Sequence, residues 1–394
     1  MRVLVTDSNT RSALAAVRSL GRAGHEVIVA GVRHPSLASV SRYCSSFESY
    51  QNPGTNPDGF VEAVASITER RRIELLLPMT EITTLLATGH RDRWPAACRL
   101  PFPEGRTIAA ASDKAFMVQL ANELGVPAPR TVVAASAAEG IAAAAGLPFP
   151  VVIKPSRSRV RTGSTWLSTG VSYAADPADL GRQLSALPCA AYPVLLQERI
   201  EGPGRGLFAC FDQGRPVALF AHRRLREKPP SGGVSVLCES APLDPVAVDY
   251  GTRLLSRLGW QGVAMVEFKQ DQRDGSLRLM EINARFWGSL QLAIDAGVDF
   301  PRILADVAAG KAPAAPGPYR VGVRTRWLAG DFDALLMLLT RSRHRLDLPA
   351  SHPGRLATLA RFLRPWGPDL NFELERRDDP APARLEWRRR LTGG

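Results

Sequence analysis

The stretch LRLMEINARFWGS, from Leu277 to Ser289, begins as an apolar run and then changes character. Within it, Glu281, Asn283 and Arg285 alternate with apolar residues. Because residues two apart lie on the same face of a β-strand, this spacing predicts a carboxylate, an amide and a guanidinium side by side at the end of a hydrophobic strand. The three side chains are therefore the first candidates for a functional site.

A further carboxylate, Glu267, stands near the end of the preceding apolar run, GVAMVEFKQ. The segment DQRDG between the two runs is a turn signal, so we expect antiparallel neighbouring strands in which Glu267 and Glu281 approach each other. Two close carboxylates repel unless a cation lies between them. Carboxylate and amide oxygens suit Mg²⁺, and Arg285 supplies a positive fork for phosphate or carboxylate. The alternative is a solvent-exposed strand with alternating polar residues. Such a strand would not require Glu267 on the neighbouring strand.

Two lysines stand where a phosphate could be held. Lys154 ends the apolar run PFPVVIK, where it either extends to solvent or grips a phosphate. Lys114 lies in the first turn of an expected helix, where a cation opposes the helix dipole, although an ordinary exposed lysine is the alternative. The cationic, hydroxyl-rich loop SRSRVRTGS, residues 156–164, either closes over phosphates or is a disordered surface loop.

The run LLQERIEGPG contains Gln197, Glu198 and Ile200. It reads as an apolar strand that stops and then turns at glycine. Backbone groups at such a hinge can contact the amino group and a ring nitrogen of adenine between apolar side chains. Taken alone, this pattern has little specificity.

Composition disfavours several classes of protein. The 394 residues, 45% of them hydrophobic, suffice for two or three domains with buried cores. No apolar run approaches the roughly 20 residues that span a bilayer, and we expect no signal peptide. The five cysteines show no metal-binding spacing, which favours a reduced, cytoplasmic protein without a zinc site. The formal charge of +12 comes almost entirely from arginine without a basic run, so we expect a solvated surface and no nucleic-acid partner.

The order of expected elements places a parallel sheet first. RVLVT, SALAAVRSLGRAG and EVIVAGV read as strand, helix and strand. The first loop lacks the glycines of a dinucleotide fingerprint, which disfavours NAD. Glu81 follows the carboxyl end of a later strand, where open sheets bind ligands, but a first-turn helix acid is the interpretation we favour. The sequence pattern changes near residues 105 and 313, where we expect domain boundaries. The last residues, DDPAPARLEWRRRLTGG, are expected to fray.

Together, these segments over about residues 105–312 resemble the ATP-grasp superfamily, most of all its carbamoyl phosphate synthetase and biotin carboxylase branch with the carboxylate–amine ligases. The resemblance is carried by the order of Asp-Lys, strand-Lys, the Gln-Glu hinge, Glu267 and the Glu-x-Asn-x-Arg run. It implies an α/β chain of the α+β ATP-grasp type in three parts. These are a parallel-sheet preATP-grasp domain (1–104), a two-lobed ATP-grasp domain (105–312) with its lid at about 130–196, and a small C-terminal region (313–394) packed on the ATP-grasp domain.

The resemblance implies that ATP binds between these lobes. Lys114 and Lys154 would hold its phosphates. The adenine would lie against the hinge formed by Gln197, Glu198 and Ile200.

The same resemblance implies a divalent metal site. Glu267, Glu281 and Asn283 would bind two Mg²⁺ ions, or Mn²⁺ in their place. Arg285 would act catalytically by steadying the transferring phosphate and the acyl-phosphate.

The implied reaction is phosphoryl transfer from ATP to a small carboxylic acid, followed by attack of an amine on the acyl-phosphate. Two alternatives stay open: a phosphotransferase or carbamoyl-phosphate-like enzyme that stops at the phosphorylated product, and a regulator that binds ATP without turnover. No membrane partner is expected, and homo-oligomerisation stays open. The sequence does not name the acid or the amine.

Three departures from the family pattern bear on the reaction. The phosphate loop has one glycine and three arginines where the family is glycine-rich, and GPGRG lacks the acid that often follows the hinge to hold ribose. Ser289 stands where biotin carboxylase has a glutamate, which disfavours biotin-dependent carboxylation. Arg224 and Lys228, before PPSGGVS, are offered as contacts for the substrate carboxylate, with a plain basic strand end as the alternative.

Overall fold

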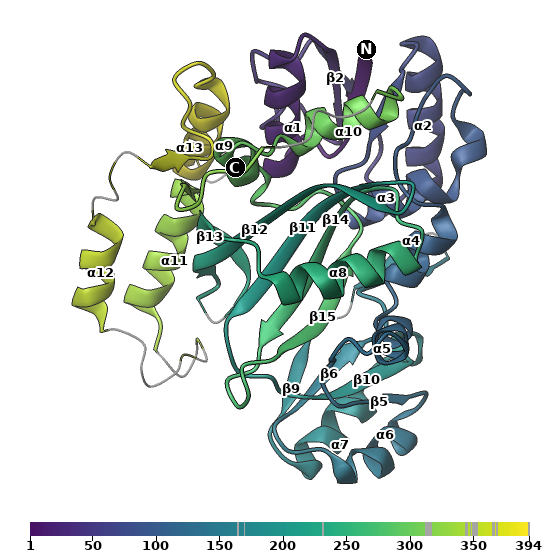
Figure 1. The fold of residues 1–394 in the computed structure, drawn as a ribbon, viewed down its shortest axis with the longest axis vertical. Helices are drawn as coiled ribbons and strands as arrows, with labels where there is room; N and C mark the ends of the chain where they lie inside the picture. Colours follow the sequence, from purple (N-terminus) through teal and green to yellow (C-terminus); the bar gives the residue numbers. More distant parts are fainter. Residues whose placement is uncertain are drawn as a thin grey trace.

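A computed structural model describes the chain at residues 1–163, 165–168, 170–230, 232–311, 317–342, 346, 348, 354–364, 367 and 369–392. Ser164 of the expected phosphate loop and the expected boundary between residues 312 and 313 lie outside these ranges. Figure 1 shows an α/β molecule with an N-terminal unit, a central sheet and a lid.

The N-terminal unit is a parallel sheet with helices, as the strand–helix–strand pattern predicted. Its strand order is β3-β2-β1-β4, and all neighbouring strands run parallel. The first strand is short and β-branched, and Thr10 begins the first helix by accepting a hydrogen bond from the Ala13 amide. The elements are β1 (Arg2–Val5), α1 (Arg11–Arg22), β2 (Glu26–Gly31), β3 (Ser46–Ser49), α2 (Pro57–Arg70), β4 (Leu75–Leu77), α3 (Glu81–Gly89) and the 3₁₀ turn η1 (Arg91–Arg93).

Two helices, α4 (Gly105–Ala111) and α5 (Lys114–Glu123), lead from this unit to the lid. The lid is a sheet of order β5-β10-β6-β9, and it lies at the lower end of the molecule in Figure 1. Its elements are β5 (Thr131–Ala134), α6 (Ala137–Ala143), η2 (Ala144–Gly146), β6 (Val151–Pro155), β9 (Ser172–Ala174), α7 (Pro177–Ala186), η3 (Cys189–Ala191) and β10 (Val194–Glu198).

The segment expected as an irregular loop after Lys154 is instead largely a hairpin. Strand β7 (Arg159–Thr162) pairs antiparallel with β8 (Thr165–Ser168). The hairpin reaches the N-terminal unit, where Trp166 Nε1 donates to the Pro53 carbonyl at 3.0 Å and Arg161 pairs with Asp58 at 2.8 Å. It therefore connects the lid to a loop and to the first turn of α2 (Pro57–Arg70) in the N-terminal unit.

The central sheet has the order β15-β14-β11-β12-β13-β16-β17 and is antiparallel except for its last pair. Alternate residues of β11 divide between two cores, so Leu207 packs with helix α8 whereas Phe208 joins a core that includes α9, α10 and the N-terminal sheet. Its strands are β11 (Gly204–Asp212), β12 (Arg215–Lys228), β13 (Val234–Ser240), β14 (Gly262–Gln270), β15 (Leu277–Asn283), β16 (Arg324–Arg326) and β17 (Leu370–Phe372). The helices are α8 (Pro245–Arg257), α9 (Leu290–Ala296), α10 (Phe300–Ala308), α11 (Leu328–Thr340), α12 (Arg355–Leu363) and α13 (Ala381–Thr392).

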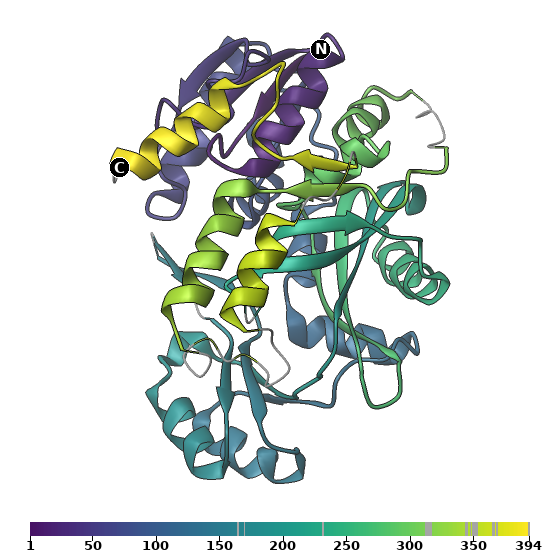
Figure 2. The same cartoon turned by 90° about the vertical axis from the view of Figure 1, so that its left-hand side faces the viewer.

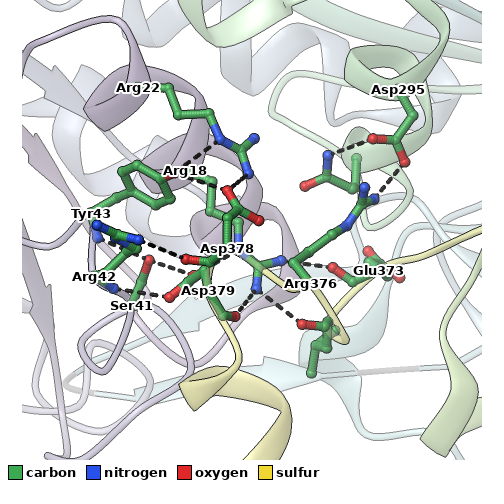
Figure 3. A network of polar contacts seen from close by, with 12 residues as sticks. Arg18, Arg22, Ser41, Arg42, Tyr43, Asp295, Glu373, Arg376, Asp378 and Asp379 are labelled. Carbon is green, nitrogen blue, oxygen red and sulfur yellow. Dashed lines mark hydrogen bonds and ion pairs between the residues drawn. The ribbon is translucent and has the colours of Figure 1, made fainter.

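The C-terminal residues do not fray as far as the structure describes them, because they dock on the N-terminal unit. After β17 the chain crosses to α1, and α13 lies beside the N-terminal elements (Figure 2). Asp379 is buried there and accepts hydrogen bonds from Arg18 Nε at 2.8 Å and Ser41 Oγ at 2.7 Å (Figure 3). The expectation of a frayed end was wrong because it overlooked this long-range partner.

The Arg18–Asp379 pair predicts a stability effect. Both side chains are 1% exposed, so replacing Asp379 with asparagine leaves a buried guanidinium without its counter-charge. We expect Asp379→Asn to lower the free energy of unfolding by about 3 kcal/mol, measured by urea denaturation. The adjacent Asp378 pairs with Arg22 at an exposed position, and Asp378→Asn is the matched control, with an expected loss below about 1 kcal/mol. Equal effects of the two variants would contradict this role for the buried pair.

Along the described parts of the chain, no helix combines the length and the apolar character needed to cross a membrane.

Candidate functional site

The site is built around a β-bulge between β14 and β15. Glu267 lies opposite Glu281, but Phe268 lies opposite Leu279, so Met280 is an extra residue in its strand. The bulge changes which face the following residues occupy. Leu277 and Leu279 point into the core before it, and Ile282 and Ala284 point into the same core after it. Glu281, Asn283 and Arg285 are therefore turned to the opposite face.

The paired acids share an electrostatic environment that favours a cation. Asn283 Nδ2 donates to Glu281 at 2.9 Å and to Glu267 at 3.4 Å. Burial raises the pKa of Glu267, and the neighbouring Glu281 charge raises it further, although Arg224 and Arg285 act in the opposite direction. A positive charge between the carboxylates would stabilise their ionised forms and so oppose this shift.

These residues fit a divalent cation. Two carboxylates face each other, and the amide of Asn283 adds an oxygen once it turns that atom toward them. In the structure this oxygen accepts a hydrogen bond from Arg285 Nη2 at 3.2 Å. No cluster of three or more His, Cys, Asp or Glu side chains suited to a metal occurs among the residues described, so a cation here would also need oxygens from a bound substrate.

Lys154 extends from the end of β6 toward this site. Burial lowers the pKa of its ammonium to about 8, and the nearby Lys114 and Lys269 charges lower it too, while Glu281 and Glu267 oppose them. Its Nζ donates to Gln197 Oε1 at 2.8 Å. A largely buried cation whose hydrogen-bond partner among the described residues is a neutral amide is suited to gain an anionic ligand.

Lys114 also lies close to Glu281. Its Nζ donates to Ser158 Oγ at 2.8 Å and stands 3.9 Å from Glu281. Asp113 begins helix α5 by accepting from two of its amides, and it also accepts from Ser156 Oγ at 2.5 Å. The start of α5 thus fixes the segment that leads into the β7–β8 hairpin.

The expected hinge is partly occupied by protein contacts. Gln197 is buried, donates to Thr131 Oγ1 at 2.8 Å and accepts from Lys154. The Glu198 carboxylate accepts from the Arg130 amide at 2.9 Å and pairs with Arg273. The Ile200 carbonyl accepts from Lys269 Nζ at 3.1 Å, whereas its amide N–H has no acceptor among the described residues.

The two residues expected at the substrate carboxylate lie in different places. Arg224 donates to Glu267 at 3.2 Å and to Glu227 at 3.0 Å, so it belongs to the acid pair. Lys228 forms an ion pair with Asp333 of α11 and lies over the Trp327 ring. Lys228 is thus held by α11, apart from the acid pair.

Two cavities meet beside these residues. A small cavity of about 160 Å³ is lined by Lys114, Ser158, Glu281 and Asn283. A larger cavity of about 1100 Å³ lies among the N-terminal unit, the β7–β8 hairpin and α13. Glu81 and Arg285 line both, so they mark the junction between them.

Glu81 lies in the wall of both cavities, although the sequence analysis favoured a simple first-turn helix acid. Its carboxylate has no hydrogen-bond or ion-pair partner among the described residues, although it lines both cavities. Asp7, at a positive φ of 54°, holds the start of α3 by accepting from the Thr80 amide at 3.1 Å and Thr83 Oγ1 at 2.6 Å. The place of Glu81 after a strand's carboxyl end was the available signal, and Asp7, just after the first strand, has the same place in the sequence.

Comparison with known sequences connects this geometry to a family. The family described as ATP-grasp in the biosynthetic pathway with Ter operon matches residues 191–330, which include Glu267, Glu281, Asn283 and Arg285. The N5-carboxyaminoimidazole ribonucleotide synthase of Pseudomonas aeruginosa is 27% identical over 190 residues, 48% of this chain and 50% of that protein. The match therefore spans about half the length of this curated relative.

Solved structures share the fold over most of the chain. The biotin carboxylase of Campylobacter jejuni superposes with a TM-score of 0.63 at 15% identity, over 82% of this chain and 74% of that one. The L-amino acid ligase of Bacillus licheniformis gives a TM-score of 0.58 at 15% identity, over 78% and 74%. At such identities the likeness concerns the fold. Together with the match of residues 191–330 to an ATP-grasp family, over the strands that carry the acid pair, this shared fold supports an ATP-grasp superfamily protein.

Proposed function

We propose that this protein is an ATP-dependent ligase that activates a small carboxylic acid as an acyl-phosphate and couples it to an amine, releasing ADP and phosphate. The observation that carries the proposal is the facing pair of Glu267 and Glu281, with Lys114 beside Glu281 and Arg285 at the junction of two cavities. Such a junction suits a reaction between a nucleotide on one side and an organic acid on the other.

In this proposal the small cavity holds the ATP phosphates. Lys114 and Lys154 provide positive charge from α5 and β6, and both lie close enough to Glu281 to interact with it electrostatically. The Ile200 N–H, which has no acceptor in the described part of the chain, is suited to donate to an adenine ring nitrogen. Gln197 connects the two regions, because it accepts from Lys154 where β10 ends at the hinge.

Glu267, Glu281 and Asn283 would hold the magnesium ions that accompany ATP. Bound Mg²⁺ neutralises the charge that builds up on the transferring phosphoryl group. Arg224 already donates to Glu267 and so fixes that carboxylate in place.

Arg285 connects nucleotide and acid. From the junction it can contact the γ-phosphate in the small cavity and a carboxylate in the large one. A carboxylate oxygen attacks the γ-phosphorus and ADP leaves. The amine nitrogen then attacks the acyl carbon and phosphate leaves, while the unpaired Glu81 at the same junction is suited to accept the amine proton.

The test is a screen of small carboxylic acids and amines for ADP formation, with the products identified by mass spectrometry. We expect turnover to require both an acid and an amine, and the product to be an amide. A phosphorylated acid as the final product would replace the ligase by a phosphotransferase. ADP formation that needs no acid and yields no coupled product would refute both.

A further inference from the structure

The large cavity has more positive than negative charge along its walls. Three acids line it, Asp7, Glu81 and Glu386. Five arginines line it, Arg11, Arg159, Arg285, Arg389 and Arg390. A ligand enclosed by these walls meets an excess of guanidinium groups, so the partner of each decides what the cavity can bind.

Two of the five arginines are neutralised by the protein. Arg11 forms an ion pair with Glu373, and Arg390 forms one with Asp333 through two nitrogens. Each has its own counter-charge outside the ligand space. These two arginines therefore contribute little attraction for an anionic ligand.

The acids on the walls do not neutralise the others. Asp7 is engaged by amide and hydroxyl donors at the start of α3. Glu386 accepts from Trp327 Nε1 at 2.9 Å. None of the three acids, Glu81 included, forms an ion pair with a cavity arginine among the residues described.

Arg389 and Arg159 have no counter-charge among the described residues. Arg389 donates to two neutral acceptors, Asn9 Oδ1 at 2.9 Å and the Pro35 carbonyl at 2.5 Å. Arg159 has no hydrogen-bond or ion-pair partner in the described part of the chain. Both are half-buried, where a guanidinium gains most from a carboxylate or phosphate partner.

These two arginines are held by separate parts of the fold. Arg389 lies on α13, which follows the buried Arg18–Asp379 pair, and Arg159 lies on the hairpin that Trp166 attaches to Pro53. Arg285, at the junction, is already assigned to the reacting carboxylate. The cavity therefore has binding capacity for an anion beyond the group that reacts.

We propose that the acid substrate carries a second anionic group, a carboxylate or a phosphate, and that Arg389 and Arg159 bind it. This inference rests on the proposed ligase function. It makes the C-terminal helix part of the substrate site, and it excludes plain monocarboxylic acids as preferred substrates.

The test compares matched acids that differ in one charge, each supplied with ATP and the same amine. The pairs are glutamate and glutamine, succinate and succinamate, and phosphoserine and serine. We expect at least one acid with two anionic groups to exceed its counterpart with a single anionic group in kcat/KM by about 10- to 100-fold. The carboxylate pairs and the phosphate pair show which anion is bound.

Variants assign the effect to residues. We expect Arg389→Gln to raise the KM for the doubly anionic acid at least about 10-fold without changing the KM for ATP. Arg388→Gln, at an exposed position on the same helix, is the matched control and should leave both constants unchanged. Arg159→Gln is the second variant, because the loss of a side chain without described partners is not expected to unfold the protein.

The outcomes separate this inference from the ligase proposal. Equal kcat/KM for the two acids of every pair, or an unchanged KM for the doubly anionic acid in both Arg389→Gln and Arg159→Gln, would overturn the second-anion inference and leave the ligase proposal intact. If no acid of either kind stimulated ADP formation, the ligase proposal itself would fail.

Discussion

The Glu281→Gln variant is expected to lose ATP turnover by a factor of at least about 1000 while keeping its fold. Glutamine has the same size, and its amide oxygen can still accept the hydrogen bond that Asn283 Nδ2 gives to the carboxylate. The loss is therefore one of charge. With Glu281 neutral, the acid pair holds a cation through Glu267 alone, and Lys114 loses its ion-pair partner.

Two measurements separate this effect from misfolding. ADP formation is followed at saturating ATP, acid and amine, and ATP binding is measured by calorimetry with and without Mg²⁺. We expect Glu281→Gln to lose the gain in ATP affinity that Mg²⁺ gives the unchanged protein. Glu201→Gln, an exposed acid just after the hinge, is the control and should behave like the unchanged protein. Turnover within tenfold of normal in Glu281→Gln would contradict the metal role of the pair.

The sequence predicted the strands of this site because the signals are local. The runs 262–270 and 277–283 are strands, and the Asp-Gly turn between them sets Glu267 opposite Glu281. The bulge at Met280 was not predicted. Its only sign in the sequence is that two apolar residues, Leu279 and Met280, follow each other. Such a pair interrupts the alternation of a strand but does not by itself indicate a bulge.

The C-terminal contribution was not predictable for a different reason. Strand β17 has only three residues, and its partner β16 lies far from it in the sequence. The two residues of the Arg18–Asp379 pair are 361 positions apart in sequence. The pair fixes the chain just before α13, and Arg389 of this helix lines the large cavity. Pairings over such separations follow from the packed chain, and no local propensity encodes them.

The partners of the candidate cations were equally hidden in the sequence. Lys228 and Arg224 lie four residues apart on one strand, yet one pairs with α11 and the other with the acid pair. The pairing of β12 with β13 shifts register twice between these two residues, so their side chains take different directions. The residue types indicated a cationic edge, but only the fold assigns each cation to its partner.

Lys154 makes ATP binding depend on pH in a defined direction. Its pKa is lowered from 10.5 to about 8 by burial, so the ammonium loses its proton as pH rises through 8. Bound phosphates favour the charged form, and binding above pH 8 must therefore include uptake of a proton. We expect the Kd for ATP to be nearly constant below pH 7 and to rise by up to about tenfold per unit above pH 8. Calorimetry in two buffers with different ionisation enthalpies measures the proton uptake directly.

Replacing Lys154 with methionine should remove this dependence together with most of the affinity. Methionine keeps an apolar stem in the buried strand end but provides no charge, so we expect kcat/KM for ATP to fall by about 100- to 1000-fold at pH 7. Between pH 7 and 9 the remaining affinity should no longer change with pH. Lys311→Met, at an exposed lysine, is the matched control and should keep both the affinity and its pH dependence. If Lys154→Met retained the pH dependence of the unchanged protein, another group would have to bind the phosphates, because a residue without a titrating proton cannot produce that slope.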